Sequence, residues 1–190
     1  MQTAGFVLAG GASSRMGRNK ALLMLGDRTL IETVASAVRE AAGNVTLVGP
    51  PEIYLPFGFP VIPDLQANLG PLAGIETALS RTTAAWNLIV ACDMPRVTPF
   101  TLRRILDAAE THPEALCILP TVRESFSVEP LCAAYHQRLL PAISQALAAG
   151  IRKVTDALPR ESIQYLRITD EGAFQNINTP DEWRRVSEQR

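Results

Sequence analysis

The chain has 190 residues, of which 47% are hydrophobic and 19% are charged, and its formal net charge is −1. This length predicts one domain, and this composition can fill a sizeable core, which excludes the class of intrinsically disordered proteins. Because basic and acidic residues nearly balance, the sequence predicts no binding to nucleic acid or to an anionic membrane surface. Any anionic ligand must therefore be bound by a local cluster of cations.

Three further features bear on the cellular compartment. The cysteines are three in number and far apart, which is typical of reduced cytosolic thiols rather than of a disulfide framework or a zinc site. The first residues lack the basic region of a signal peptide, and their apolar run is short. No stretch approaches the roughly 20 apolar residues of a membrane span. We therefore expect a soluble, cytoplasmic protein.

Strand-like and helix-like segments alternate along the chain. Strands are expected at residues 3–9, 44–49, around Val61 and Ile62, and at 86–91, 115–120, 130–135 and 162–168. Helices are expected at 29–41, 72–82, 99–110, before Gly150, at 153–158 and from Thr179 onward. Such alternation predicts an α/β fold with a mostly parallel sheet flanked by helices. In open sheets of this kind, ligands bind outside the carboxyl ends of the strands.

A glycine-rich basic loop follows the first expected strand. Gly10 and Gly11 let backbone N–H groups approach a phosphate or a planar base closely, because no Cβ is in the way. Arg15 and Lys20 supply mobile cations suited to a polyphosphate. The loop matches neither the Walker pattern nor the dinucleotide-binding pattern. A solvated basic turn is the competing interpretation, but the position at a strand's carboxyl end favours a ligand site.

An acidic residue, Asp93, follows the fourth expected strand, after the uncharged stretch from Leu88 to Cys92. A carboxylate at a strand end, opposite a phosphate-binding loop, is well placed to hold Mg²⁺, which prefers oxygen ligands and bridges phosphates. The alternative is that Asp93 only begins a turn before Pro95. The residues alone leave both interpretations open.

Six elements together resemble one known family. These are "LAGG" (8–11), "SRMG" (14–17), Lys20, "GPLAG" (70–74), "CDMP" (92–95) and "NINTP" (176–180). In order and spacing they resemble the molybdenum cofactor guanylyltransferases, from about residue 5 to about residue 183. The resemblance implies a Rossmann-like nucleotidyltransferase fold in a single domain, residues 1–190. Its nucleotide-binding part would span about 1–115, and its pterin- or acceptor-binding part about 116–190.

The resemblance also implies roles for particular residues. Nucleotide-binding roles fall on Leu8, Ala9, Gly10, Gly11, Lys20, Asp64, Gly70, Gly74 and Asp93. Catalytic roles fall on Arg15, Lys20, Asn176 and Asn178. In this scheme the "LAGG" backbone lines the base and phosphates of GTP, Asp64 contacts the nucleoside, and the glycines of "GPLAG" shape the pocket wall. Asp93 holds Mg²⁺, to which Asn178 could add a carbonyl oxygen.

The implied activity is transfer of GMP from GTP to the terminal phosphate of molybdenum-molybdopterin, with release of pyrophosphate and with Mg²⁺ as cofactor. Further implied partners are molybdenum-insertion proteins and apo-molybdoenzymes or their chaperones. One position departs from the family: some members carry Asn after the second strand, where this chain has Gly49. Two alternatives stay open, a sister transferase that uses CTP and a non-catalytic nucleotide-binding module. The doubled glycine of "LAGG" favours the guanylyl branch.

Overall fold

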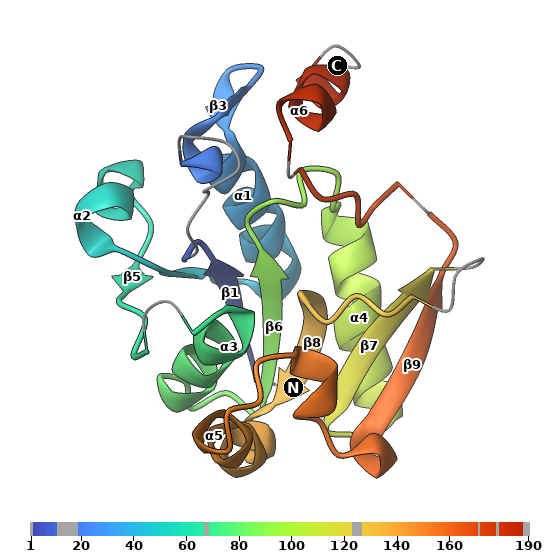
Figure 1. Ribbon diagram of the computed structural model, residues 1–190. Helices are drawn as coiled ribbons and strands as arrows, with labels where there is room; N and C mark the ends of the chain where they lie inside the picture. Colours follow the sequence, from blue (N-terminus) through green and yellow to red (C-terminus); the bar gives the residue numbers. More distant parts are fainter. Residues whose placement is uncertain are drawn as a thin grey trace.

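The computed structural model describes residues 2–10, 19–66, 69–122, 127–170, 172–177 and 179–187. Its centre is a seven-stranded sheet with the order β5-β4-β1-β6-β8-β7-β9 (Figure 1). The strands are β1 (Thr3–Leu8), β4 (Thr46–Val48), β5 (Val61–Ile62), β6 (Trp86–Ala91), β7 (Cys117–Val122), β8 (Cys132–His136) and β9 (Ile163–Ile168). Only β8 runs antiparallel to its neighbours, so the prediction of an α/β fold with a mostly parallel sheet is confirmed.

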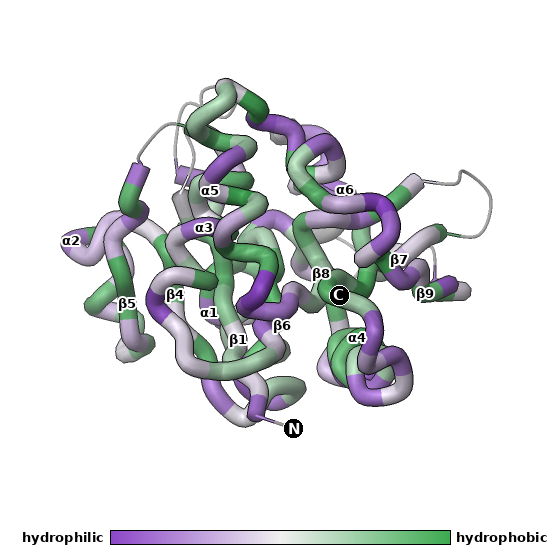
Figure 2. The backbone as a smooth tube through the Cα atoms, turned by 90° about the horizontal axis from the view of Figure 1, so that it is seen from below, coloured by the Kyte–Doolittle hydropathy of each residue, from purple (hydrophilic) through white to green (hydrophobic). Residues whose placement is uncertain are grey.

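The α-helices cover both faces of this sheet. They are α1 (Leu30–Ala42), α2 (Pro51–Tyr54), α3 (Pro71–Ser80), α4 (Pro99–Thr111), α5 (Leu140–Ala148) and α6 (Pro180–Ser187). Figure 2 shows hydrophobic residues along β1 and β8 in the middle of the molecule, with α3 and α5 on one side and α4 on the other. None of the helices in the described ranges combines the length and the apolar character that a membrane crossing requires.

Successive strand residues divide between two cores, because side chains alternate across a sheet. Val7 packs in the core that α1 and α4 cover, whereas Phe6 and Leu8 pack in the core that α3 and α5 cover. The same alternation separates Val90 from Ile89 on β6. The central strands are therefore apolar on both faces, and their polar ligand-binding groups must lie at the strand ends.

Most expected helix boundaries agree with the structure. Thr29 and Glu32 form the expected capping box, in which the Thr29 backbone N–H donates to the Glu32 carboxylate at 2.8 Å. Thr98 caps α4, and Gly150 follows α5 with φ +84°, a backbone angle that glycine adopts without steric cost. These local signals fixed the helix ends because each satisfies backbone groups that the helix leaves unpaired.

Three local features differ from the expectations. The helix expected at 153–158 is only a single 3₁₀ turn, η4 (Val154–Asp156). Pro159 comes next and restricts the residue before it to extended conformations, so no longer helix forms. A hairpin of β2 (Met24–Leu25) and β3 (Arg28–Thr29) and the short helix α2 were not expected. Their two- to four-residue lengths are too short to produce a periodic pattern.

Candidate nucleotide-binding site

The candidate site lies where the order of the strands reverses. The chain passes from β1 to β4 and β5 on one side, and α3 then returns it to β6 on the other side of β1. Leu8 at the end of β1 pairs with Ala91 at the end of β6, and the Cys92 N–H donates to the Leu8 carbonyl at 3.1 Å. The start of the glycine loop and Asp93 therefore meet at a switch point, the usual ligand position in open α/β sheets.

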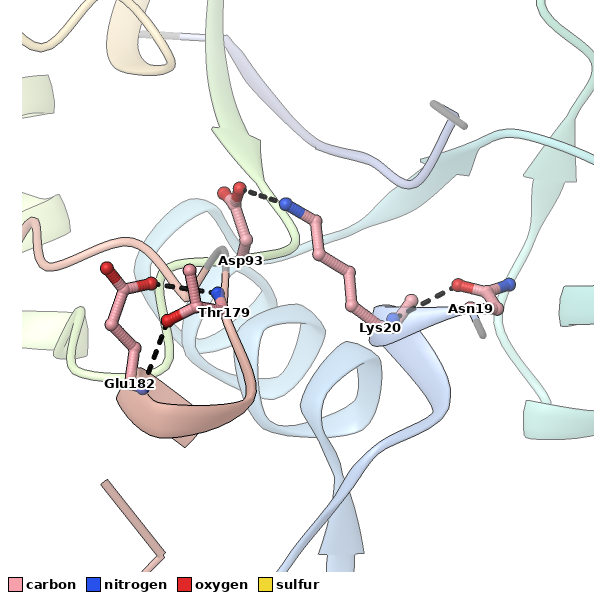
Figure 3. A network of polar contacts seen from close by, with 6 residues as sticks. Asn19, Lys20, Asp93, Thr179 and Glu182 are labelled. Carbon is pink, nitrogen blue, oxygen red and sulfur yellow. Dashed lines mark hydrogen bonds and ion pairs between the residues drawn. The ribbon is translucent and has the colours of Figure 1, made fainter. Parts of the chain in front are cut away.

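Lys20 and Asp93 face each other at this point. Lys20 begins the 3₁₀ helix η1 (Lys20–Leu22), whose N-cap is Asn19, with the Asn19 side chain accepting from the Ala21 N–H. Its Nζ lies 2.5 Å from Asp93 Oδ2, as Figure 3 shows. The two side chains are 22% and 15% exposed, so the pair is largely shielded from water. The structure thus brings two sequence-predicted residues, one cation and one carboxylate, into direct contact.

Two side-chain oxygens in this part of the molecule are buried without a hydrogen-bond partner among the described residues: Oδ1 of Asp93 and Oδ1 of Asn176, the residue before Ile177. The Ile177 N–H donates to the Asp93 carbonyl at 3.0 Å, which ties the segment that carries Asn176 to the end of β6. Buried oxygens without partners are costly unless a ligand satisfies them. Carboxylate and amide oxygens are the donors that Mg²⁺ prefers, so these two groups fit the implied ion.

The C-terminal segment is held by the start of α6. The Thr179 N–H donates to Glu182 Oε2 at 3.0 Å, and the Glu182 N–H donates to Thr179 Oγ1 at 3.2 Å (Figure 3). This reciprocal pair is a capping box and confirms the helix start expected at Thr179. The contact of this segment with Asp93 is the separate Ile177 N–H bond to the Asp93 carbonyl.

Asp64 lies near Gly10, the last described residue after β1. Thr77, fully buried on α3, donates its hydroxyl to Asp64 Oδ1 at 3.0 Å and accepts the Leu65 N–H at 3.0 Å. The second carboxylate oxygen, Oδ2, faces Gly10: a Cβ built on Gly10 would lie 3.6 Å from it. The structure therefore brings Asp64 close to Gly10, and its contact with the nucleoside stays a prediction.

Of the two glycines of "GPLAG", one permits an unusual backbone angle and the other permits close packing. Gly70 stands before α3 with φ +83°, where a side chain would be strained. Gly74 lies against Leu8, and a Cβ there would come within 3.1 Å of the Leu8 side chain. The missing side chain lets α3 approach β1 closely. The expectation that these glycines shape the pocket wall stays a prediction.

Three of the expected site residues, Gly11, Arg15 and Asn178, lie outside the described residues. Cys92, next to Asp93, is buried, and this burial together with the negative charge of Asp93 raises the pKa of its thiol to about 12. It therefore stays protonated at neutral pH and is a poor nucleophile or metal ligand.

Thr77 and Glu129 are residues of this region that sequence reasoning missed. Burial, and after it the negative charge of Asp93, raises the pKa of the Glu129 carboxyl. Glu129 precedes β8, and because β8 is antiparallel its amino end lies at the carboxyl ends of its neighbours. Recognising β8 as antiparallel would have indicated Glu129. Nothing in the sequence pattern singles out Thr77, which lies on the buried face of a helix.

Comparison with solved structures places this architecture in a known class. The chain superimposes on the crystal structure of molybdopterin-guanine dinucleotide biosynthesis protein A from Archaeoglobus fulgidus with a TM-score of 0.82. The two sequences are 27% identical, and the alignment covers 98% of this chain and 97% of that one. The sheet, its switch-point site and this similarity define the class of the protein: a nucleotidyltransferase domain.

Comparison of sequences gives the family. A family model described as a MobA-like NTP transferase domain matches residues 5–162. Probable molybdenum cofactor guanylyltransferases from Pelotomaculum thermopropionicum and Flavobacterium johnsoniae are 37% and 34% identical. These alignments cover 96% and 93% of this chain and 90% and 92% of the relatives. The chain belongs to the MobA-like NTP transferase family, which confirms the resemblance that the motifs indicate.

Proposed function

We propose that this protein transfers GMP from GTP to the terminal phosphate of molybdenum-molybdopterin and forms the guanine dinucleotide cofactor. A phosphate oxygen of the acceptor would attack the α-phosphorus of GTP in line. The new P–O bond would form as the bond to the β-phosphate breaks, and pyrophosphate would leave with the electron pair. The observation that carries the proposal is the Lys20–Asp93 pair at the end of β1 and β6, in a chain whose relatives bear this activity in their names.

Lys20 would neutralise charge on the reacting phosphates. Phosphoryl and nucleotidyl transfers need positioning and charge stabilisation more than they need a protein nucleophile. The ammonium group of Lys20 is already held at the switch point by Asp93, in surroundings that are largely closed to water. Charge stabilisation is stronger in such surroundings than in open solvent.

Asp93 and Asn176 would hold Mg²⁺ through their Oδ1 atoms, which are buried and have no hydrogen-bond partner among the described residues. When bound, Mg²⁺ would screen the charges of the triphosphate that repel the attacking phosphate. Among the described residues, no group of three or more His, Cys, Asp or Glu side chains is arranged to hold a metal by itself. The remaining ligands of the ion would come from phosphates and water, since Mg²⁺ usually keeps several waters and binds substrate phosphates.

Asp64 would contribute to the choice of the base. Its Oδ1 is engaged by Thr77, and its Oδ2 faces Gly10, where it could accept hydrogen bonds from the N–H groups of a guanine edge. Cytosine offers a different donor and acceptor pattern on its edge. The position after β4 cannot take part through a side chain, because it is Gly49. The sister activity with CTP is therefore the alternative that must be tested.

The surrounding biology follows from the same proposal. All three cysteines are buried free thiols, which supports a reducing compartment and hence the cytoplasm. The molybdenum-molybdopterin would come from molybdenum-insertion proteins, and the product would pass to apo-molybdoenzymes or their chaperones.

A nucleotide panel in a thermal-shift assay with Mg²⁺ tests the proposed base selectivity. GTP should raise the melting temperature more than CTP or ATP, since at equal concentration the ligand with the lower Kd stabilises the folded state more. Asp64→Asn should reduce the preference for GTP, because an amide replaces the second acceptor oxygen. An equal or larger shift with CTP in the wild-type protein would contradict the guanylyl assignment. No shift with any nucleotide would contradict nucleotide transfer altogether.

A further inference from the structure

Tyr54, the last residue of α2, lies beneath the nucleotide site and is only 1% exposed. Its hydroxyl donates to the Ala9 carbonyl at 2.9 Å and accepts from Asn19 Nδ2 at 3.0 Å. This buried hydroxyl therefore both donates and accepts a hydrogen bond. Burial raises the pKa of Tyr54, so the hydroxyl keeps the proton that it donates.

The ring of Tyr54 occupies the space beside Gly49. A Cβ built on Gly49 would come within 3.0 Å of Tyr54 Cε2 and within 3.3 Å of the Ala9 carbonyl carbon. Contacts this short force a neighbour to move. The glycine that departs from the pattern of the family is thus the residue that allows Tyr54 to reach Ala9.

The hydroxyl joins two parts of the candidate site. Ala9 follows β1 and begins the glycine loop, while Asn19 is the N-cap of the turn that carries Lys20. Asn19 itself is held from two sides, since its Oδ1 accepts the Ala21 N–H at 3.1 Å and its Nδ2 donates to Tyr54. One buried side chain therefore connects the carbonyl at the loop's start to the cap that orients Lys20.

We propose that Tyr54 is a positioning residue of the nucleotide site: its hydroxyl sets the spacing between the backbone after β1 and the lysine that faces Asp93. The backbone N–H groups that follow β1 and the Lys20 ammonium would then bind one triphosphate without having to move. A site that is already arranged for its ligand loses less conformational freedom on binding. This inference rests on the proposed function, because it takes the ligand to be a nucleoside triphosphate.

The first test is Tyr54→Phe, which removes the hydroxyl and keeps the ring. The Ala9 carbonyl and the Asn19 amide lose their buried partner, and the spacing between them is no longer fixed. We expect the Kd for GTP with Mg²⁺, measured by calorimetry, and the KM for GTP to rise about 10-fold. The value of kcat should change less than about twofold, because saturating GTP restores the arrangement and only uniform binding is lost.

A matched control comes from the opposite end of β1. Asn44 also makes two hydrogen bonds to this strand's backbone, accepting the Gly5 N–H at 2.9 Å and donating to the Thr3 carbonyl at 3.0 Å. Asn44→Ala should lower the free energy of unfolding and leave the Kd for GTP unchanged. If it weakened GTP binding as much as Tyr54→Phe does, general loss of stability would explain both results and the inference would be wrong.

Two further variants, at Asn19 and Gly49, test the same hydrogen-bonded connection through Tyr54. Asn19→Ser keeps a capping oxygen for η1 but removes the amide that donates to Tyr54. Gly49→Ala adds the methyl group that collides with the ring. Both should raise the Kd for GTP. Asn19→Ser combined with Tyr54→Phe should weaken binding less than the sum of the two, because both remove one shared hydrogen bond.

The outcomes separate the inference from the proposed function. Wild-type protein that binds no GTP would contradict the proposed function itself. Wild-type binding of GTP, together with unchanged Kd in a folded Tyr54→Phe variant, would contradict only the role of Tyr54. If Tyr54→Phe does not fold, Asn19→Ser decides by the same criterion.

Discussion

Lys20 and Asp93 lie 73 residues apart in the chain and meet as an ion pair at the switch point of the sheet. Asp93 also presents a second oxygen that has no partner among the described residues. The shielded ammonium of such a site can bind a negatively charged substrate, and the second carboxylate oxygen can bind a divalent ion that accompanies it.

Replacement of Lys20 tests its role at the phosphates. Lys20→Ala should lower kcat/KM by about a hundred- to a thousand-fold, the usual loss when one charge-stabilising group is removed. Lys20→Arg should not restore the full rate, because a guanidinium is broader and prefers bidentate geometry. Steady-state kinetics with GTP as the varied substrate measures both. Arg103 is an exposed cation on α4 that donates to the Glu40 carbonyl at 2.9 Å, so Arg103→Ala should retain the wild-type rate. If Lys20→Ala also retained the wild-type rate, Lys20 would have no role at the phosphates.

Replacement of Asp93 tests the ion. Asp93→Ala and Asp93→Asn should each lower the rate about a hundred- to a thousand-fold. Alanine removes the ligand oxygens altogether, and asparagine leaves only a neutral oxygen, which holds a hard cation weakly. Asn176→Ala and Asn178→Ala should cost less, since a carbonyl ligand carries no full charge. The measurement is the initial rate against Mg²⁺ concentration for each variant. Near-normal activity of Asp93→Ala at ordinary Mg²⁺ would mean that Asp93 is only a turn residue.

The Thr77 hydroxyl should matter for GTP recognition although it lies beneath the site. Thr77→Val is close in shape but leaves Asp64 Oδ1 and the Leu65 N–H without their bonds to the hydroxyl. We expect the KM for GTP to rise several-fold, with little change in kcat, because Asp64 is then held less firmly. Thr77→Ser keeps the hydroxyl and should restore most of the affinity. Identical KM values for Thr77→Val and wild type would show that Asp64 needs no such support.

His136 should make stability depend on pH. Its Nδ1 accepts a hydrogen bond from the Arg138 backbone N–H at 3.1 Å. Its ring packs edge-to-face against the Trp86 ring, with 5.2 Å between the ring centroids. Burial, and after it the charge of Arg138, lowers the pKa of His136 below 6.5. The folded state therefore resists protonation: its stability is complete above pH 6.5 and falls as the pH drops toward the lowered pKa.

The His136→Asn variant checks this dependence. Asparagine keeps an accepting cap but does not titrate, so its free energy of unfolding should fall less between pH 7 and pH 5 than that of the wild type. The difference should stay well below about 1.4 kcal/mol per pH unit, because the ring is partly exposed and solvent screens the charge. Parallel urea-unfolding curves at the two pH values measure it. The same slope in both proteins would contradict the neutral state of His136.

The sequence predicted the features that local rules determine. The capping box at Thr29, the cap at Thr98 and the strand that ends before Asp93 all follow from neighbouring residues, and the last of these placed Asp93 at a strand end. The contact between Lys20 and Asp93 was not predictable from spacing, because it depends on how β1 and β6 pair. Tyr54 was missed for a similar reason: it belongs to a four-residue helix, and its function comes from a tertiary hydrogen bond.

Transfer of GMP itself tests the central claim most directly. The protein would be incubated with GTP, Mg²⁺ and molybdenum-molybdopterin, and the pyrophosphate and the dinucleotide product would be quantified together. The account predicts one pyrophosphate for each guanine dinucleotide, formation that depends on the acceptor, and near-complete loss of both in Asp93→Ala. Wild-type protein that binds both substrates yet releases no pyrophosphate, or that forms product with CTP in place of GTP, would contradict it.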